Sequence, residues 1–297
     1  MPKTSPIAAA ASILSAMLLI GFIDNFVVNI AQDAGLWQFH LTRSAMAVPM
    51  IAGLALVGVG TLALRRPGAV FIRSITMSVA MVIYFGSLAF LPISDAVAGL
   101  FTAPLFVLLI SILILKERMG LVRIAAAIAG FVGVMLVLRP DGGALSWTSA
   151  VPVFAGFFYA VAAILTRTRC AEESATALLA SFFAALGICG ALGVAILYVY
   201  PVSSDDPGFV LRGWASPTPA FLGWTLLQAV GSIAAVGLIT RSYQMADTSF
   251  VAVFEYSLLI FASLWAWILR GEVLDPMAMF GIGIIIASGV IIALRGR

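Results

Sequence analysis

The chain has 297 residues, of which 63% are hydrophobic and only 10% are charged. A soluble domain carries roughly a quarter charged residues, and it could not bury this much apolar surface in its own core. The composition therefore excludes an ordinary soluble protein and makes the lipid bilayer the expected surroundings of the chain. No basic patch interleaved with aromatic residues accompanies the net charge of +3, so we expect no nucleic-acid partner.

Ten apolar runs are long enough to cross a bilayer, which takes about 20 residues. Prolines, glycines and charged residues separate the runs, as in Arg65–Gly68 and in the stretch 201–219. The sequence therefore predicts an all-α polytopic membrane protein with ten transmembrane helices. In chain order these helices cover residues 7–31, 38–64, 70–90, 94–115, 120–139, 146–166, 174–200, 219–241, 248–270 and 275–294.

The loop charges predict the orientation of the chain. Twelve of the 16 lysines and arginines fall on the side that holds both termini, three fall on the opposite side, and Arg43 lies inside a span. Loops rich in Lys and Arg stay in the cytoplasm. We therefore expect both termini to be cytoplasmic.

Two parts of the chain resemble each other at an offset of 155 or 156 residues. Residues 114–119 correspond to residues 269–274, and residues 133–139 correspond to residues 289–295. The offset divides the chain into two repeats, residues 1–140 and 141–297, with five predicted helices each. Because five is odd, the second copy is expected upside down in the membrane. Inverted repeats recur in secondary transporters, where two halves exchange conformations to open either side.

One motif links the chain to a known family. Ala103-Pro104-Leu105-Phe106 precedes Leu115-Lys116-Glu117-Arg118, and the sequence resembles the drug/metabolite transporter superfamily, specifically its ten-helix EamA branch. The second copy departs from that pattern, with Leu259 where the family often has proline. The resemblance implies a secondary transporter of a small organic metabolite in a bacterial inner membrane. It implies no cofactor and leaves a homodimer open.

Members of that family move substrates in both directions. Many export amino acids or related metabolites, and this direction is slightly favoured here. Uptake of riboflavin or S-adenosylmethionine is the alternative, since the first span with Asp24 and the segment 37–43 resemble importing members.

Polar residues inside the first two spans are candidates for substrate binding or coupling, because each is costly in hydrocarbon without a partner or a watery cavity. Asp24 and Arg43 lie at comparable depth and could meet, either around a substrate or as a structural ion pair. His40 is the only histidine, and either a pH-sensitive gate near the periplasmic mouth or an interfacial hydrogen bond would explain it. The candidates here are Asp24, Asn25, Asn29, His40 and Arg43.

Glu255 is the sharper candidate for proton coupling. It lies about 10 Å inside the ninth span, at 1.5 Å per residue, with no basic residue within one helical turn. A carboxyl group in apolar surroundings can take up and release protons, although a structural hydrogen bond to another helix is the alternative. Further cavity-lining candidates, for which packing is the alternative, are Tyr84, Tyr159, Gln228 and Tyr256.

Two other classes of function fit the sequence less well. A membrane-embedded hydrolase needs a metal-binding pair of histidines or a nucleophile beside a base. One histidine and no clustered carboxylates argue against that chemistry and against a metal site. A channel would show rings of charge or filter-like repeats, which the sequence lacks. We therefore predict a carrier rather than an enzyme.

Overall fold

The computed structural model describes residues 5–87, 90–91, 93–139, 147–202 and 208–295. Within these residues the regular elements are all helices, and ten helical stretches are long and apolar enough to cross a membrane. The prediction of an all-α protein with ten spans is thus confirmed. The predicted boundary between the repeats, at residues 140 and 141, lies outside the described residues.

The described helices follow the predicted spans closely, with three of those spans divided in two. Their bounds are α1 (Pro6–Asp24), α2 (Val27–Asp33), α3 (Leu36–Leu56), α4 (Pro67–Ser87), α5 (Ile93–Leu100), α6 (Ala103–Leu113), α7 (Leu121–Leu138), α8 (Trp147–Thr168), α9 (Ala175–Val199), α10 (Gly208–Leu211), α11 (Pro219–Met245), α12 (Thr248–Phe254), α13 (Ser257–Arg270) and α14 (Pro276–Arg295).

The first, fourth and ninth spans are broken, where continuous helices were predicted. The breaks fall at Asn25–Phe26, Phe101–Thr102 and Glu255–Tyr256. At each break the backbone closes short turns to the residue three positions earlier, for example from the Glu255 N–H to the Ala252 carbonyl at 3.2 Å. Such tight turns within a helix often mark functional hinges.

The second predicted span, residues 38–64, was extended too far. Helix α3 ends at Leu56, and Gly58 and Gly60 follow with φ angles of +88° and +78°. Left-handed backbone of this kind suits glycine and ends a helix. The apolar composition continues past this point, which explains the error.

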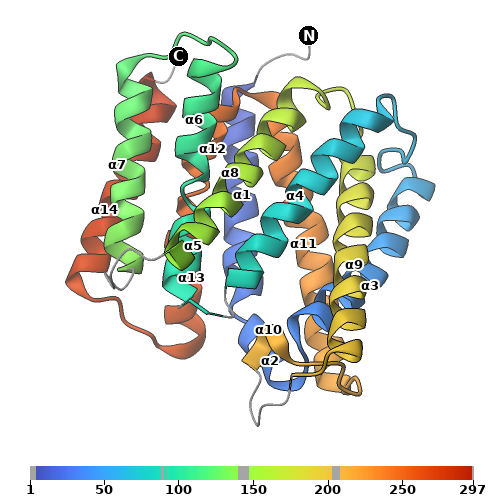
Figure 1. Ribbon diagram of the computed structural model, residues 1–297. Coiled ribbons are helices and arrows are strands. Elements are labelled where there is room, and N and C mark those ends of the chain that lie inside the picture. Colours follow the sequence, from blue (N-terminus) through green and yellow to red (C-terminus); the bar gives the residue numbers. More distant parts are fainter. Residues whose placement is uncertain (1–4, 88–89, 92, 140–146, 203–207, 296–297) are drawn as a thin grey trace.

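The spans pack in pairs. Helix α7 lies against α14 at one flank of the molecule and α3 against α9 at the other, while α4 packs on α8 and α1 on α11 (Figure 1). In the order of the ten spans these pairs are 5 with 10, 2 with 7, 3 with 6 and 1 with 8. If each span is replaced by its counterpart five positions earlier or later in this order, the same four pairs result. This pattern supports the predicted five-helix repeat, whose inverted orientation stays a prediction.

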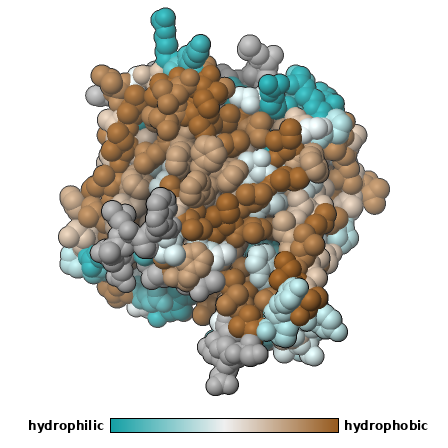
Figure 2. Space-filling view, viewed as in Figure 1, coloured by the Kyte–Doolittle hydropathy of each residue, from teal (hydrophilic) through white to brown (hydrophobic). Residues whose placement is uncertain are grey.

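The outer surface of the bundle is apolar. Ile188, Leu192 and Ile196 follow one another at four-residue intervals along α9 and are 62%, 58% and 58% exposed. Hydrophobic side chains cover the middle of the face in Figure 2, and hydrophilic ones gather toward its two ends. A belt of this kind matches a bilayer, in which apolar side chains need no protein partner.

Candidate functional site

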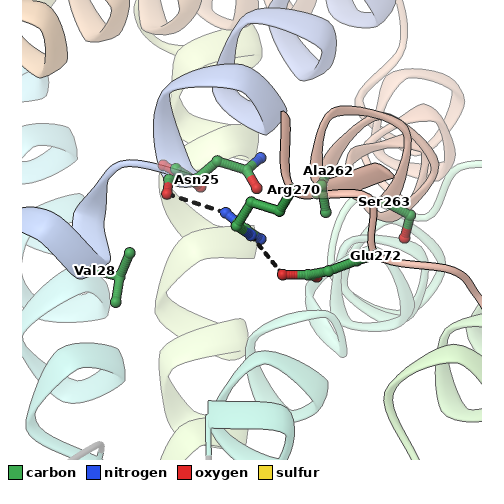
Figure 3. Close-up of a pocket in the computed structure, with 8 residues that line it drawn as sticks. Asn25, Val28, Ala262, Ser263, Arg270 and Glu272 are labelled. Carbon is green, nitrogen blue, oxygen red and sulfur yellow. Dashed lines mark hydrogen bonds and ion pairs between the residues drawn. The ribbon is translucent and has the colours of Figure 1, made fainter. Parts of the chain in front are cut away.

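A cavity opens where α1 breaks before α2. Its volume is about 640 Å³, within the range of small-molecule sites. Figure 3 shows Asn25 and Arg270 pointing toward one another across it, and Arg270 donates a hydrogen bond to the Asn25 carbonyl at 3.3 Å. The lining residues are Asp24, Asn25, Val28, Ala262, Ser263, Ala266, Arg270 and Glu272.

Asp24 carries the unmatched charge of this cavity. Its side chain is exposed, and within the described part of the chain it makes no hydrogen bond or ion pair. Arg43 on α3 and Tyr84 on α4 both lie within electrostatic range of its carboxyl group. The structure thus brings Asp24, Arg43 and Tyr84 near one another, but the suggested Asp24–Arg43 ion pair is not formed.

Arg43 is held away from Asp24 by its own neighbours. Its guanidinium lies 4.7 Å from the ring centre of Phe39 and 5.8 Å from that of Phe183. One terminal nitrogen is 3.2 Å from His40 Nδ1. Its buried Nε has no hydrogen-bond partner among the described residues. Two rings and a histidine therefore fix a cation that lacks a matching anion.

His40 does not lie at an open mouth, as the sequence had suggested. Its side chain is only 2% exposed, and its ring contacts those of Phe39 and Phe85. Its Nε2 is buried with no partner in the described part of the protein. The geometry makes His40 a support for Arg43.

Two of the candidate amides differ in what they contact. Gln228, 1% exposed on α11, donates a hydrogen bond to the carbonyl of Ile23 at 2.6 Å and so fixes the broken end of α1. This contact favours a structural role. Asn29 is half-buried on α2 and does not line the cavity.

A second group of polar side chains surrounds the break between α12 and α13. Glu255 is 5% exposed and accepts a hydrogen bond from the Tyr159 hydroxyl at 2.7 Å. The hydroxyl of Tyr243 on α11 lies near the same carboxyl group without a hydrogen bond of good geometry. No cation pairs with Glu255 among the described residues. The hydroxyl of Tyr159 thus stabilises a buried carboxyl group at a helix break.

Tyr256 packs where the two equivalent breaks meet. Its fully buried ring lies 6.1 Å from that of Phe101, and these two residues are 155 positions apart, as the repeat predicts. A Cβ on Gly130 would lie 2.6 Å from the same ring. The close fit favours packing as the role of Tyr256.

Sequence reasoning missed Arg73 as a buried residue, because it was counted only among the twelve charges on the side that holds both termini. Its side chain is instead 3% exposed and donates hydrogen bonds to Thr166, to the Leu178 carbonyl and to Thr240. These partners lie on α8, α9 and α11. The buried serines 74 and 78 share its helix. That polar stripe was the available signal that this face of α4 points inward.

Residues 7–139 match the model of the EamA-like transporter family. The first of the two predicted repeats therefore resembles EamA-type transporters. A solved crystal structure has the same fold, with a TM-score of 0.80 over 98% of each chain at 19% identity. The family and the named relatives below are transporters rather than enzymes.

The named relatives of this chain carry different substrates. A riboflavin transporter of Vibrio cholerae is 27% identical, over 92% of this chain and 89% of the relative. A pseudopaline exporter of Pseudomonas aeruginosa is also 27% identical, over 79% and 78%. An S-adenosylmethionine uptake transporter of Rickettsia bellii is 23% identical, over 79% and 75%. The likeness shows a membrane transporter of small molecules and leaves substrate and direction to be proposed.

The geometry gives the described part of the chain two separate polar sites. One contains an open cavity with an unmatched carboxylate and a cation held nearby. The other contains a buried carboxyl group bonded to a tyrosine. Among the described residues no group of three potential metal-binding side chains occurs. Binding and proton exchange are therefore the chemistry that these side chains can supply.

Proposed function

We propose that the chain is a secondary carrier that couples the movement of a small organic metabolite to protons through Glu255. The observation that carries this proposal is the Tyr159–Glu255 hydrogen bond at 2.7 Å, which stabilises a buried acid without any cation beside it. An ionised carboxylate buried without a counter-charge costs several kcal/mol. Proton binding and release at Glu255 are therefore coupled to any conformational change that alters the surroundings of its carboxyl group.

The three helix breaks supply the moving parts. Broken spans bring backbone groups and polar side chains into the interior of a transporter, and their tight turns allow half-helices to tilt. Glu255 belongs to such a turn, so a change in its charge acts directly on the joint between α12 and α13. We take the two five-helix repeats to be inverted and both termini to be cytoplasmic, as the loop charges predict.

Uptake of a vitamin or nucleoside-like compound is the first candidate for the direction and substrate. The support is that the riboflavin transporter aligns over more of the chain than the exporter does at the same identity. Export of an amino acid or related metabolite is the second candidate. It is supported by the pseudopaline exporter, whose alignment still covers most of both chains.

Ligand-dependent thermal unfolding of the purified protein in detergent identifies the substrate. The panel contains amino acids, S-adenosylmethionine, riboflavin and polyamines. A ligand at a hundred times its dissociation constant stabilises the folded state by about 2.7 kcal/mol, which such an assay detects. The same panel, tested in inverted and right-side-out vesicles, then gives the direction of transport.

Glu255→Gln tests the coupling. In proteoliposomes we expect this variant to lose accumulation driven by a proton gradient and to keep exchange of labelled for unlabelled substrate. Tyr159→Phe is the matched variant, because it removes the hydrogen bond and leaves the carboxyl group. It should retain coupling with an altered pH profile. Unchanged accumulation by Glu255→Gln would remove Glu255 from the coupling step.

A further inference from the structure

We infer that a groove at the far end of α9 binds a phospholipid of the surrounding bilayer, with an acyl chain in the groove. The groove is separate from the two polar sites, so the inference does not depend on which substrate is carried. It is carried by a second cavity of about 640 Å³, on the flank where α3 packs against α9 (Figure 1). The lining includes Leu41, Ala191, Val194, Ala195, Tyr198 and Trp214.

The sequence of α9 shapes the groove. Its lining residues 191, 194, 195 and 198 recur at intervals of three and four, which places them on one face of the helix. Ala191 and Ala195 on this face are exposed and short, so they leave a hollow. The larger Leu192 and Ile196 beside them project from the exposed surface of the bundle. The hollow is therefore continuous with the apolar surface that the bilayer covers.

The position of the groove favours a lipid as its occupant. Ala191 lies about 24 Å along α9 at 1.5 Å per residue, within the thickness of about 30 Å of the hydrocarbon core. Beyond it Tyr198, Tyr200 and Trp214 are 84%, 74% and 53% exposed. Tyrosine and tryptophan gather at the level where hydrocarbon meets the headgroups. An acyl chain can thus lie along the alanines while its headgroup stays level with the aromatic rings.

The chemistry of the lining points to the chain of the lipid rather than to its headgroup. Among the described residues that line the groove, none is acidic or basic. A charged ligand buried there would lose its hydration without meeting a counter-charge, which is costly. A hydrocarbon chain has no such cost. We therefore expect the groove to distinguish lipids by their chains and to accept zwitterionic and anionic headgroups alike.

The groove shares Trp214 with the loop that holds α2. The neighbouring Ala215 exchanges two hydrogen bonds with the side chain of Gln38, donating at 2.9 Å and accepting at 2.7 Å. In the same loop Arg212 donates to two carbonyls at the end of α2, at 2.7 and 2.9 Å. A lipid that packs on Trp214 would therefore also steady the half-helix that follows the break in α1.

The test measures lipid binding to the full-length protein in detergent micelles. The probe is phosphatidylethanolamine with brominated acyl chains, which quenches the fluorescence of a tryptophan that it touches. The part of the signal that belongs to Trp214 is the difference between the parent protein and Trp214→Phe. We expect the quenching of this part to saturate at a single site. Unlabelled phosphatidylglycerol should compete, whereas glycerophosphoethanolamine, which has the headgroup and no acyl chain, should not.

Ala191→Phe and Ala184→Phe are a matched pair of variants. Both add the same ring at an exposed position of α9, seven residues apart on one face, but only Ala191 lines the groove. Ala191→Phe fills the hollow and should lower the affinity for the lipid by about tenfold or more, which is about 1.4 kcal/mol. Ala184→Phe should bind like the parent protein. Ala195→Leu fills less of the same hollow and should cause a smaller loss, which separates filling from a folding defect.

Several results would overturn the site. Quenching that rises without saturation, or that is equal in the two phenylalanine variants, would show unspecific contact with lipid only. Competition by glycerophosphoethanolamine would place the binding at the headgroup. Dimerisation that Ala191→Phe abolishes would assign the groove to a second copy of the chain. For the link to α2, we expect the lipid to slow hydrogen exchange in residues 208–218 of the parent protein but not of Ala191→Phe, and equal exchange with and without lipid would refute that link.

Discussion

Replacing Gly133 by alanine is expected to force α7 and α14 apart. A Cβ at Gly133 would lie 2.8 Å from the carbonyl oxygen of Gly281, and a Cβ at Gly281 would lie 2.7 Å from the carbonyl oxygen of Gly133. The two backbones thus approach each other reciprocally. Close approach of small residues replaces the hydrophobic drive that lipid cannot supply between helices.

The size of the destabilisation expected for Gly133→Ala follows from the geometry. Ordinary contact begins at 3.4 Å, so the Gly281 carbonyl must move by about 0.6 Å to accept the new methyl group. The neighbour is backbone rather than the end of a flexible side chain, so the whole helix must shift. Overpacking of this kind costs about 1–3 kcal/mol. At about 2–4 °C per kcal/mol, the melting temperature should fall by about 2–12 °C.

Gly283→Ala is the matched control, on the facing helix α14. Nothing lies within 4 Å of a Cβ at Gly283, so the added methyl group meets open space. Thermal unfolding in detergent, followed by tryptophan fluorescence, compares the two variants with the parent protein. We expect Gly283→Ala to melt at or slightly above the parent temperature. Equal melting of both variants would refute the reasoning that α7 and α14 touch through these glycines.

Two further predictions concern charges outside the membrane spans. Glu173 is 5% exposed and accepts hydrogen bonds from the two backbone N–H groups directly before α4. Glu173→Ala should therefore lower the free energy of unfolding by about 1–2 kcal/mol. Glu172→Ala, which removes only an exposed ion pair at 3.8 Å, should change it by less than about 0.5 kcal/mol in the same melts. Hydrogen bonds from the Ala278 and Met277 N–H groups, together with Arg139, hold the pKa of Asp275 below its usual value. Because the pKa of Asp275 is lowered in the folded protein, its ionised carboxylate stabilises the fold above about pH 4. This stabilisation is lost as the pH falls through the pKa that Asp275 has in the folded state. The melting curves of Asp275→Asn and of the parent protein should therefore converge below about pH 4. A difference between the two melting curves that does not shrink as the pH falls below about 4 would contradict this origin.

The number and order of the spans could be predicted because each apolar run is long enough by itself. The breaks could not, because each of the three spans is apolar as a whole, although Asn25 and Glu255 lie at two of the breaks. Phe101 looks like any residue of a membrane helix, and the turn there is shown by the backbone hydrogen bond from the Thr102 N–H to the Gly99 carbonyl at 3.1 Å. The end of α3 was missed for a similar reason, because the leucines and valines after Leu56 continue the apolar pattern.

The candidate site was predictable in its residues and less so in its contacts. Asp24, Arg43 and Glu255 were singled out because charge is costly in hydrocarbon. Whether Asp24 meets Arg43 depends on Phe183, which is 140 residues away along the chain and holds Arg43 from another helix. Sequence spacing carries no information about such a neighbour. Arg73 was misjudged because depth along a helix does not say which face points inward.

The two polar sites lie at different depths, measured from the same end of the bundle. The Ser5 N–H bonds to the Met245 carbonyl, so α1 begins where α11 ends. From that end Asp24 is about 27 Å along α1 and Glu255 about 10 Å along the ninth span, at 1.5 Å per residue. The proposed substrate and proton sites thus lie at different levels, and α1 packs directly on α12.

Ion pairs and hydrogen bonds also join the helices at the end near Glu255. Asp247 lies between Arg123 at 3.6 Å and Arg167 at 3.9 Å, which ties the start of α12 to α7 and α8. Gln244 donates hydrogen bonds to two carbonyls of the loop after α8. The cavity at Asp24 opens toward the other end. An open substrate site beyond a closed end is what one state of a carrier requires, whereas a channel would need a path through both ends at once. In the proposed carrier, release toward the end near Glu255 would break the contacts of Asp247. The helix break at Glu255 lies seven residues beyond Thr248, where α12 begins.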